Sequence, residues 1–203
     1  MTQRLIQQGA EAKIILDEEK KIIIKDRIKK IYRIKELDEK IRKKRTKAEK
    51  KLLEKASKII KAPNPFPLKE EYKIEMPFIE GKKISEFLNS FSLEKQKEIC
   101  RQIGKEIANL HEADIIHGDL TTSNMILVED KIFFIDFGLG YISKKIEDKA
   151  VDLHLLKQAL EAKHFQNWEV LFKEVLTGYK NYKESEKILE RFRAVEKRGR
   201  YKH

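Results

Sequence analysis

Cysteine, proline and long apolar runs are scarce in this sequence. Its 203 residues include one cysteine, four prolines and eight glycines. No run of about 18 apolar residues, the length that spans a bilayer, occurs anywhere in it. The first residues, MTQRLIQQGAEA, lack the apolar core of a signal peptide. A single cysteine excludes an internal disulfide framework and is typical of a reducing compartment. We therefore expect a cytoplasmic protein without a membrane segment.

The one cysteine, Cys100, falls within a segment that has helical periodicity. It shares a stripe with Leu93, Ile103, Ile107 and Leu110. This position predicts a buried core thiol rather than a nucleophile.

Charge is abundant and unevenly distributed. The net charge is +11, and charged residues make up 39% of the chain. Residues 25–51 hold fourteen Lys and Arg against five Asp and Glu, and the last thirteen residues hold six against one. Residues 111–152 hold four against nine. Two basic ends suggest a polyanionic partner, and an acidic middle suggests bound cations. A solvated charged surface is the alternative for any single run.

The first 80 residues predict a small β-rich unit with one long helix. Residues 12–25 contain two β-branched runs around a polar turn, which predicts a hairpin. Residues 36–60 contain no Gly or Pro and predict a helix, which the prolines of 62–70 end. A strand follows in 72–81. The helix should bury one apolar face, formed by Ile41, Ala48, Leu52, Leu53, Ala56 and either Ile59 or Ile60.

The rest of the chain predicts a mainly helical unit with a few short strands. Ser92 is a plausible N-cap for an amphipathic helix over 92–112. We expect an α+β protein with two lobes, 1–80 and 81–196, and a polar, mobile tail over 197–203. The remaining elements expected are strands at 114–116, 124–128 and 131–135 and helices at 147–163, 166–177 and 184–196.

Three polar side chains stand beside the short strands. Asp119 and Asn124 are five residues apart across a turn, and Asp136 ends the next strand pair, so all three can face one cavity. Buried polar groups of this kind need a partner. Their oxygens suit Mg²⁺, whose coordination phosphate oxygens would complete. We expect Asn124 and Asp136 to be the metal ligands.

A lysine and a glutamate of the first lobe could serve the same cavity. Lys25 ends the run KIIIK on a predicted strand, where its charge could meet phosphates. Glu49, on the long helix, could pair with Lys25 and fix its direction. Glu54 is on the same helix and is the other candidate partner.

These residues resemble the motifs of the protein kinase superfamily. His117-Gly118-Asp119-Leu120 through Asn124, followed by Asp136-Phe137-Gly138, is similar to the HRDLxxxN and DFG motifs. The resemblance implies a kinase-like fold and ATP as the nucleotide. It implies that Asp119 is the catalytic base, that Asn124 and Asp136 bind Mg²⁺, and that Lys25 binds phosphate with Glu49 as its partner.

Further positions follow from the same resemblance. The segment EMPFIEG is similar to an interlobe hinge, which implies adenine binding by the backbone at Glu75, Met76 and Phe78. Asp152 resembles the helix aspartate that braces the catalytic loop, and a helix-capping or surface carboxylate is the alternative. His117 is expected to be a packed, hydrogen-bonded scaffold residue.

Three departures separate the chain from ordinary protein kinases. A GxGxxG loop is missing, and QQGAEAKI offers only Gly9 for a shorter nucleotide clamp. Gly118 replaces the arginine of HRD, which removes the usual coupling to a phosphorylated activation loop. Thirteen residues separate Gly138 from Asp152, without an APE motif. We therefore expect the residues for phosphoryl transfer to be retained and the surface that binds a peptide substrate to be missing.

These departures resemble the small atypical kinase subunits of the KEOPS complex, which are relatives of the RIO kinases. The resemblance also rests on RTKAE, which favours Glu49 over Glu54, on the short segment after IDFG, and on the terminal RGRY. It implies an ATPase or weak serine/threonine kinase that supports threonylcarbamoylation of adenosine in tRNA. It also implies one partner that carries out the transfer and another that docks on the small lobe.

Two other classes of function remain open. Small-molecule kinases of the aminoglycoside or choline type also carry HGDLxxxN, although they generally have a larger helical lobe. A non-catalytic RNA-binding scaffold with a relict nucleotide site is the third possibility. The four intact polar positions argue against it.

Overall fold

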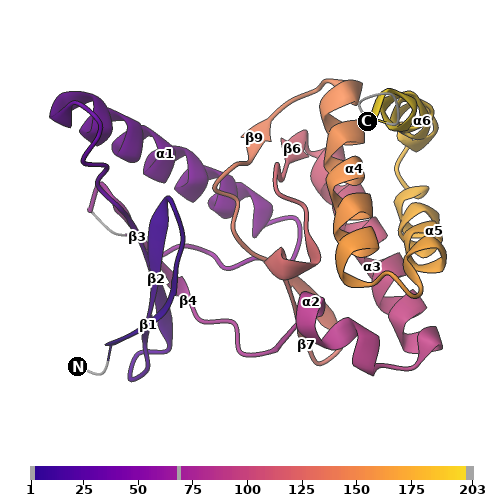
Figure 1. The fold of residues 1–203 in the computed structure, drawn as a ribbon, viewed down its shortest axis with the longest axis horizontal. Helices are drawn as coiled ribbons and strands as arrows, with labels where there is room; N and C mark the ends of the chain where they lie inside the picture. Colours follow the sequence, from indigo (N-terminus) through magenta and orange to yellow (C-terminus); the bar gives the residue numbers. More distant parts are fainter. Residues whose placement is uncertain (1–2, 68–69, 200–203) are drawn as a thin grey trace.

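An antiparallel sheet and one long helix form the N-terminal part of the molecule. The computed structural model describes residues 3–67 and 70–199. Four strands lie in the order β1-β2-β3-β4, and α1 runs beside them toward the rest of the molecule (Figure 1). The bounds are β1 Gln3–Gln8, β2 Ala12–Asp17, β3 Ile22–Arg27, α1 Lys35–Ala56 and β4 Lys73–Pro77.

The predicted hairpin is confirmed as the β2–β3 pair, in which Ile15 lies opposite Ile24. Strand β1 was not predicted. All six of its residues are exposed and four of them are glutamine or arginine, so it lacks the alternating pattern of a half-buried strand. It is held at the sheet edge by backbone pairing with β2.

The buried face of α1 is more polar than the sequence predicted. Leu52, Leu53 and Ala56 are buried as expected, and Ile60 is buried just beyond the helix end. Ala48 is exposed, so its predicted place in the apolar face is wrong, and Ile41 is half-buried. The buried positions in the first two thirds of the helix are polar instead: Asp38, Thr46 and Glu49.

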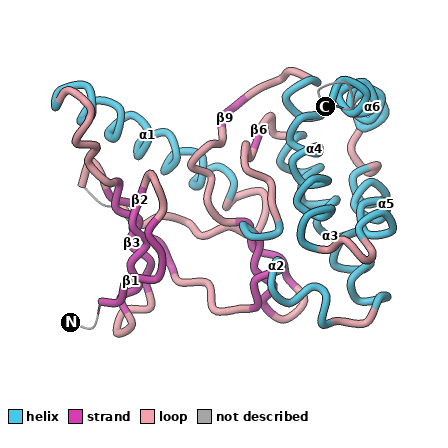
Figure 2. The backbone as a smooth tube through the Cα atoms, viewed as in Figure 1, coloured by secondary structure: helices cyan, strands magenta, loops and turns pink. Residues whose placement is uncertain are grey.

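The C-terminal part is mainly helical (Figure 2). Helix α3 packs against α5, and α4 packs against α6. Strands β5, β7 and β8 form one small sheet, and β6 pairs with β9. The bounds are β5 Lys82–Lys83, α2 Ile84–Phe87, η1 Leu88–Ser90, α3 Leu93–Glu112, β6 Ile115–Ile116, η2 Thr122–Asn124, β7 Met125–Val128, β8 Lys131–Phe134, β9 Tyr141–Ile142, α4 Ile146–Lys163, α5 Trp168–Tyr179 and α6 Ser185–Gly199.

Local features of this part agree with the sequence. The Ser92 side chain caps α3 by accepting a hydrogen bond from the Lys95 amide. Cys100 is fully buried among apolar side chains, and burial raises the pKa of its thiol to about 12. A thiol with such a pKa is protonated at neutral pH, which excludes the thiolate chemistry of a nucleophile.

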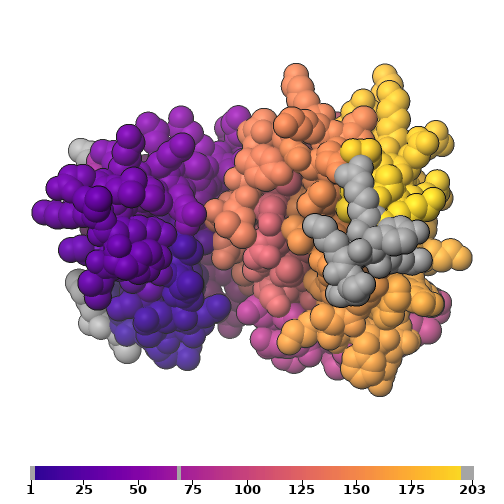
Figure 3. Space-filling view, turned by 45° about the horizontal axis from the view of Figure 1, so that its top comes forward, coloured from indigo at the N-terminus to yellow at the C-terminus, as the bar shows by residue number. Residues whose placement is uncertain are grey.

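The predicted α+β organisation is confirmed: a sheet with one helix is followed by a mainly helical part. Figure 3 shows these two parts side by side. The lobe boundary after residue 80 stays a prediction. Helix α6 extends to Gly199, so residues 197–199 of the predicted tail 197–203 are helical, and residues 200–203 lie outside the described residues. Over the described ranges, none of the helices combines the length and apolarity needed to cross a membrane. The cytoplasmic location stays a prediction.

Candidate active site

Lys25 lies at the centre of an ion-pair cluster in which Lys25 and Glu49 are buried and Asp136 is partly exposed. Its Nζ is 2.6 Å from Glu49 Oε1 and 2.7 Å from Asp136 Oδ1. Lys25 comes from β3, Glu49 from α1, and Asp136 from the segment after β8. The structure thus brings together three of the residues singled out from the sequence, and Glu49 rather than Glu54 is the partner of Lys25.

The electrostatics of the cluster favour the charged forms. Burial alone would lower the pKa of Lys25, but the charges of Glu49 and Asp136 hold it above its usual value. Burial would likewise raise the pKa of Asp136, but Lys25 and the Gly138 amide hold it below its usual value. Both side chains are therefore ionised at neutral pH.

Arg27 is a member of this cluster that the sequence reasoning missed. Its Nη2 is 2.5 Å from Glu49 Oε2, and both side chains are almost completely buried. A signal was present in the sequence: Lys25 and Arg27 are two residues apart on a strand, so their side chains point to the same face.

Asp119 and Asn124 lie in contact in the loop between β6 and β7. Asn124 Nδ2 donates to the backbone oxygen and to Oδ2 of Asp119, each at 2.9 Å. The backbone carbonyl oxygen of Asn124 also accepts a hydrogen bond from the Ile135 amide at 2.9 Å, which ties the loop to the segment before Asp136. Asp119 is half-buried, so its carboxylate is held in place and remains accessible.

Asp152 of α4 holds the start of this loop. Its Oδ2 accepts the His117 amide and its Oδ1 accepts the Gly118 amide, both at 2.9 Å. His111 Nε2 lies 3.2 Å from Oδ2. Asp152 is 1% exposed, which excludes a surface carboxylate and supports the bracing interpretation.

His117 has the scaffold contacts that were expected. Its Nδ1 accepts the Asp119 amide at 3.3 Å, so Nε2 carries the proton and donates to the Ile135 carbonyl at 3.1 Å. Burial lowers the pKa of His117, which keeps the ring neutral. The ring also packs against Phe137, with centroids 4.5 Å apart.

Gly118 meets a steric requirement in this loop. Its φ is +77°, and a Cβ built there would lie 2.4 Å from the Leu139 carbonyl oxygen. Leu139 is in the segment that leads to β9, where Tyr141 pairs with Ile116. The position that holds arginine in the HRD motif is therefore closed by backbone.

A pocket of about 260 Å³ opens onto the cluster. It is lined by Lys25, Asp119 and Asp136 from the expected site and by Gly9 from the β1–β2 turn. Arg27 and Arg45 also line it. Gly9 thus lies where a nucleotide clamp was expected, and its role stays a prediction.

The predicted hinge residues lie at the end of β4. Glu75 and Met76 pair with β3 opposite Ile24 and Ile23. The Phe78 amide donates to the Lys21 carbonyl at 2.9 Å, so it is already engaged with the protein. Adenine binding at Glu75, Met76 and Phe78 stays a prediction.

The donors at Asn124 and Asp136 fit a hard cation such as Mg²⁺. The Asn124 amide nitrogen faces Asp119, so its carbonyl Oδ1 is turned away and can ligate. Asp136 is ionised, and its side chain is 46% exposed. Mg²⁺ typically takes one or two such protein oxygens and completes its shell with phosphate oxygens and water. Within the ranges that the structure describes, no group of three or more His, Cys, Asp and Glu side chains is arranged to hold a metal ion.

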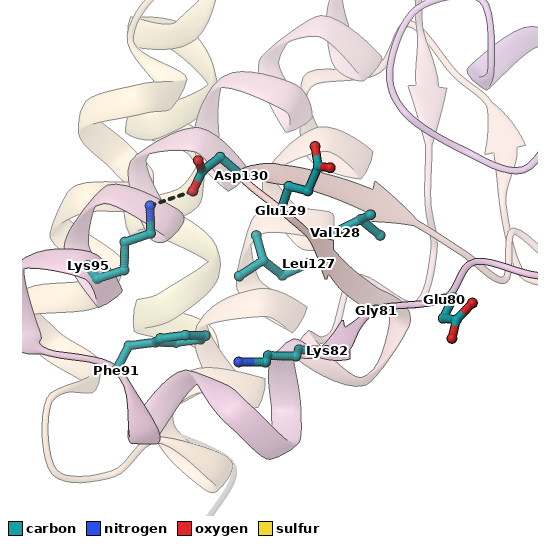
Figure 4. A pocket seen from close by; sticks show the side chains of 9 residues that line it. All are labelled: Glu80, Gly81, Lys82, Phe91, Lys95, Leu127, Val128, Glu129 and Asp130. Carbon is teal, nitrogen blue, oxygen red and sulfur yellow. Dashed lines mark hydrogen bonds and ion pairs between the residues drawn. The ribbon is translucent and has the colours of Figure 1, made fainter.

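A second pocket, of about 490 Å³, lies apart from these residues. It is formed around Phe91, Leu127 and Lys82 in the C-terminal part (Figure 4). Lys95, joined to Asp130 at 2.8 Å, lies at one side. None of the residues predicted for the nucleotide site lines it.

Comparisons with known proteins agree with this geometry. The family model described as the RIO domain matches residues 16–144. The KEOPS complex subunit Bud32 of Pyrococcus abyssi is 46% identical over 212 residues, which cover 98% of this chain and 96% of that protein.

Longer relatives align over nearly the whole of this chain. Proteins of Methanococcus maripaludis and Methanosarcina acetivorans, each named "Probable bifunctional tRNA threonylcarbamoyladenosine biosynthesis protein", are 43% and 38% identical. The alignments cover 98% and 97% of this chain but only 36% and 35% of those proteins. This chain therefore belongs to the RIO-domain family of kinase-like proteins, together with the KEOPS subunit Bud32.

Proposed function

We propose that this chain binds ATP with Mg²⁺ and acts as an ATPase or atypical serine/threonine kinase within a KEOPS complex, in support of N6-threonylcarbamoyladenosine formation in tRNA. The observation that carries the enzymatic part is the cluster of Lys25, Glu49 and Asp136 at the pocket that Asp119 also lines. The KEOPS and tRNA parts rest on the similarity to Bud32 and to the bifunctional proteins.

Three residues that line the pocket, Lys25, Asp119 and Asp136, and two next to them, Glu49 and Asn124, have a task in this proposal. Lys25 moves from Asp136 to the phosphates of the nucleotide while Glu49 keeps hold of it. Asn124 and Asp136 supply oxygen ligands to the metal. Mg²⁺ bound there would neutralise charge on the phosphates. Asp119, fixed by Asn124 at 2.9 Å, orients the attacking hydroxyl or water and accepts its proton.

Adenine binding is assigned to the backbone after Met76. Pro77 has no N–H, and the Phe78 amide is engaged by Lys21. The carbonyl of Pro77 and the amide of Ile79 are the neighbouring groups that can meet the base. The Pro77 carbonyl and the Ile79 amide thus take the adenine-binding role that was expected of Phe78, and the hinge stays in the segment expected from the sequence.

The short segment after Gly138 favours hydrolysis or a restricted acceptor. Residues 139–145 lead directly from the cluster to α4, and Tyr141 and Ile142 pair with β6. This connection is too short to form a surface that binds an extended peptide substrate. The partner that performs the transfer and the partner on the small lobe would regulate turnover.

A basic stripe on α1 supports tRNA as a partner. Lys40, Lys44, Lys47 and Lys51 recur every three or four residues, so they share one face of the helix, and all are exposed. At 1.5 Å per residue the stripe is about 16 Å long. Lysines spaced along such a length can follow a phosphate backbone.

Turnover by the purified protein tests the enzymatic proposal. We expect Mg²⁺-dependent ATP hydrolysis, measured with and without tRNA and with aminoglycosides and choline as competing acceptors. Asp119→Asn should reduce kcat by about 10²–10⁴-fold while ATP affinity, measured by calorimetry, changes little. Asp130→Asn, in the exposed β7–β8 turn, is the control and should retain the wild-type rate. Equal rates in wild type and Asp119→Asn would favour the scaffold, and stoichiometric phosphorylation of a small acceptor would favour the metabolite kinase.

A further inference from the structure

Glu49 is shared between two cations that come from one strand. Lys25 binds its Oε1 at 2.6 Å and Arg27 binds its Oε2 at 2.5 Å. The three side chains are 8%, 4% and 1% exposed, for Lys25, Arg27 and Glu49 respectively. Both oxygens of the carboxylate are therefore occupied, and its plane is fixed by the spacing of residues 25 and 27 on β3.

Arg27 also balances the charge of the cluster. Lys25 alone faces two carboxylates, those of Glu49 and Asp136. With Arg27 the cluster contains two cations and two anions, which lowers the cost of burying Lys25, Arg27 and Glu49. When Lys25 turns from Asp136 toward a nucleotide, Arg27 stays on Glu49, so this carboxylate does not lose its second contact.

General stability gives a weaker reason for an arginine at this position. The buried Nε of Arg27 has no hydrogen-bond partner among the described residues. An unsatisfied buried donor is unfavourable, and an apolar side chain in place of a buried ion pair is often equally stable. What an apolar side chain cannot do is hold the Glu49 carboxylate in one orientation.

We propose that Arg27 is a positioning residue, which holds Glu49 so that Lys25 is aimed at the phosphates of the nucleotide. The inference rests on the proposed ATP-dependent function. It also accounts for how α1 can keep Glu49 in place without an activation segment, since Gly118 and Leu139 leave no space for the arginine that would couple to one. The contact that holds Glu49 comes from β3 of the N-terminal sheet instead.

The test uses the full chain and three substitutions. Arg27→Met removes the charge and the guanidinium but retains an unbranched side chain. Arg27→Lys retains the charge but replaces the planar guanidinium, which contacts Glu49 through Nη2, by an ammonium group, so it should recover part of the effect. Arg42→Met is the matched control. Arg42 also pairs with a buried carboxylate on α1, with its Nε 2.7 Å from Asp38 Oδ2, but it does not line the pocket.

Three quantities are measured for each variant: kcat for ATP hydrolysis, ATP affinity by calorimetry, and the melting temperature. We expect Arg27→Met to lower kcat about tenfold or more, because misplacing a reacting group by about 1 Å is costly. ATP affinity should change less than about threefold, since Lys25 keeps its charge near the phosphates. Arg42→Met should lower the melting temperature without a comparable loss of kcat.

A double-mutant cycle with Glu49→Gln separates action through Glu49 from direct action. If Arg27 works through Glu49, Arg27→Met should have little further effect on kcat in the Glu49→Gln protein. Independent, additive losses, a large loss of ATP affinity, or wild-type kcat in Arg27→Met would each overturn the inference. Failure of the proposed function would be recognised separately, as a wild-type rate equal to that of Asp119→Asn.

Discussion

Lys25 Nζ lies 2.7 Å from Asp136 Oδ1, and this contact joins two residues that are 111 positions apart in the chain. In the proposed mechanism this contact opens, because Lys25 must reach phosphate oxygens and Asp136 must accept a metal ion. The ion pair is therefore a resting contact that the nucleotide and its metal replace together.

Asp136→Asn tests this exchange. We expect ATP affinity in the presence of Mg²⁺ to fall at least about tenfold, since an amide is a weaker ligand than a carboxylate. Affinity measured with EDTA should be unchanged or higher, because Lys25 is no longer held by a second anion. Calorimetric titrations with and without Mg²⁺ give both values. An unchanged response to Mg²⁺ in the variant would contradict the metal role of Asp136.

Asp152→Asn should weaken the hydrogen bonds that hold the start of the catalytic loop. An amide presents only one acceptor oxygen, whereas Asp152 accepts two backbone amides. Losing a charged acceptor in a buried position should lower the free energy of unfolding by about 2–3 kcal/mol at pH 7. Urea denaturation measures this loss.

The pH dependence of that difference has a definite sign. Burial would raise the pKa of Asp152, but its contacts with His111 and His117 hold it below the ordinary value of 3.8. A group with a lowered pKa stabilises the fold above its unfolded pKa and loses this contribution as the pH falls through the folded one. The difference in the free energy of unfolding between wild type and Asp152→Asn should therefore be constant near neutrality and should shrink below about pH 4. A gap that stays constant at pH 3 would show that the carboxylate charge is not its cause.

Gly118→Ala should destabilise the protein, whereas Gly9→Ala should not. Alanine at 118 would adopt a left-handed backbone and press on the Leu139 carbonyl, 2.4 Å from its Cβ. These two terms together should cost roughly 2–4 kcal/mol. At Gly9 the nearest atom to an added Cβ is 3.9 Å away, so the change should stay within about 0.5 kcal/mol. Chemical denaturation of both variants provides the comparison, and equal stabilities would refute the steric argument.

The α1 stripe should contribute to tRNA binding through charge. Replacing Lys44 and Lys47 by Gln should weaken binding and reduce the slope of log K against log salt by about one to two. Replacing Lys105 and Lys173, two exposed lysines of α3 and α5, is the control with the same change in net charge. Binding curves at several salt concentrations measure the slopes. If both pairs give the same reduction, the stripe has no special part in RNA binding.

The sequence predicted the catalytic loop well because its residues are close together in the chain. Asp119 and Asn124 are five positions apart, and their contact needs only a local turn. The Lys25–Glu49 pair was considered from the residues alone, with Glu54 as the alternative, and resemblance favoured Glu49. The direct contact between Lys25 and Asp136 was not predicted, because Lys25 was assigned to phosphate and Asp136 to the metal ion.

Contacts that depend on packing between distant segments were not predicted. The contact of Arg27 with Glu49, which Lys25 also binds, depends on how α1 lies beside β3. The hydrogen bond from the Phe78 amide to the Lys21 carbonyl depends on where the β2–β3 turn ends. Strand β1 was missed because pairing with β2, rather than an apolar face, holds it in place. Ala48 was misplaced for a different reason: α1 buries the polar side chains of Thr46 and Glu49 where an apolar stripe was expected.

The close approach of Gly118 to Leu139 limits how this protein can be altered by mutation. An arginine at 118 would have to pass through the Leu139 carbonyl, so a single codon change cannot restore a switch that responds to loop phosphorylation. The loop and the strand-forming segment after it would have to separate first, which would also break the pairing of Tyr141 with Ile116. An engineer who wants covalent control over this site would therefore have to lengthen residues 139–145 before changing Gly118.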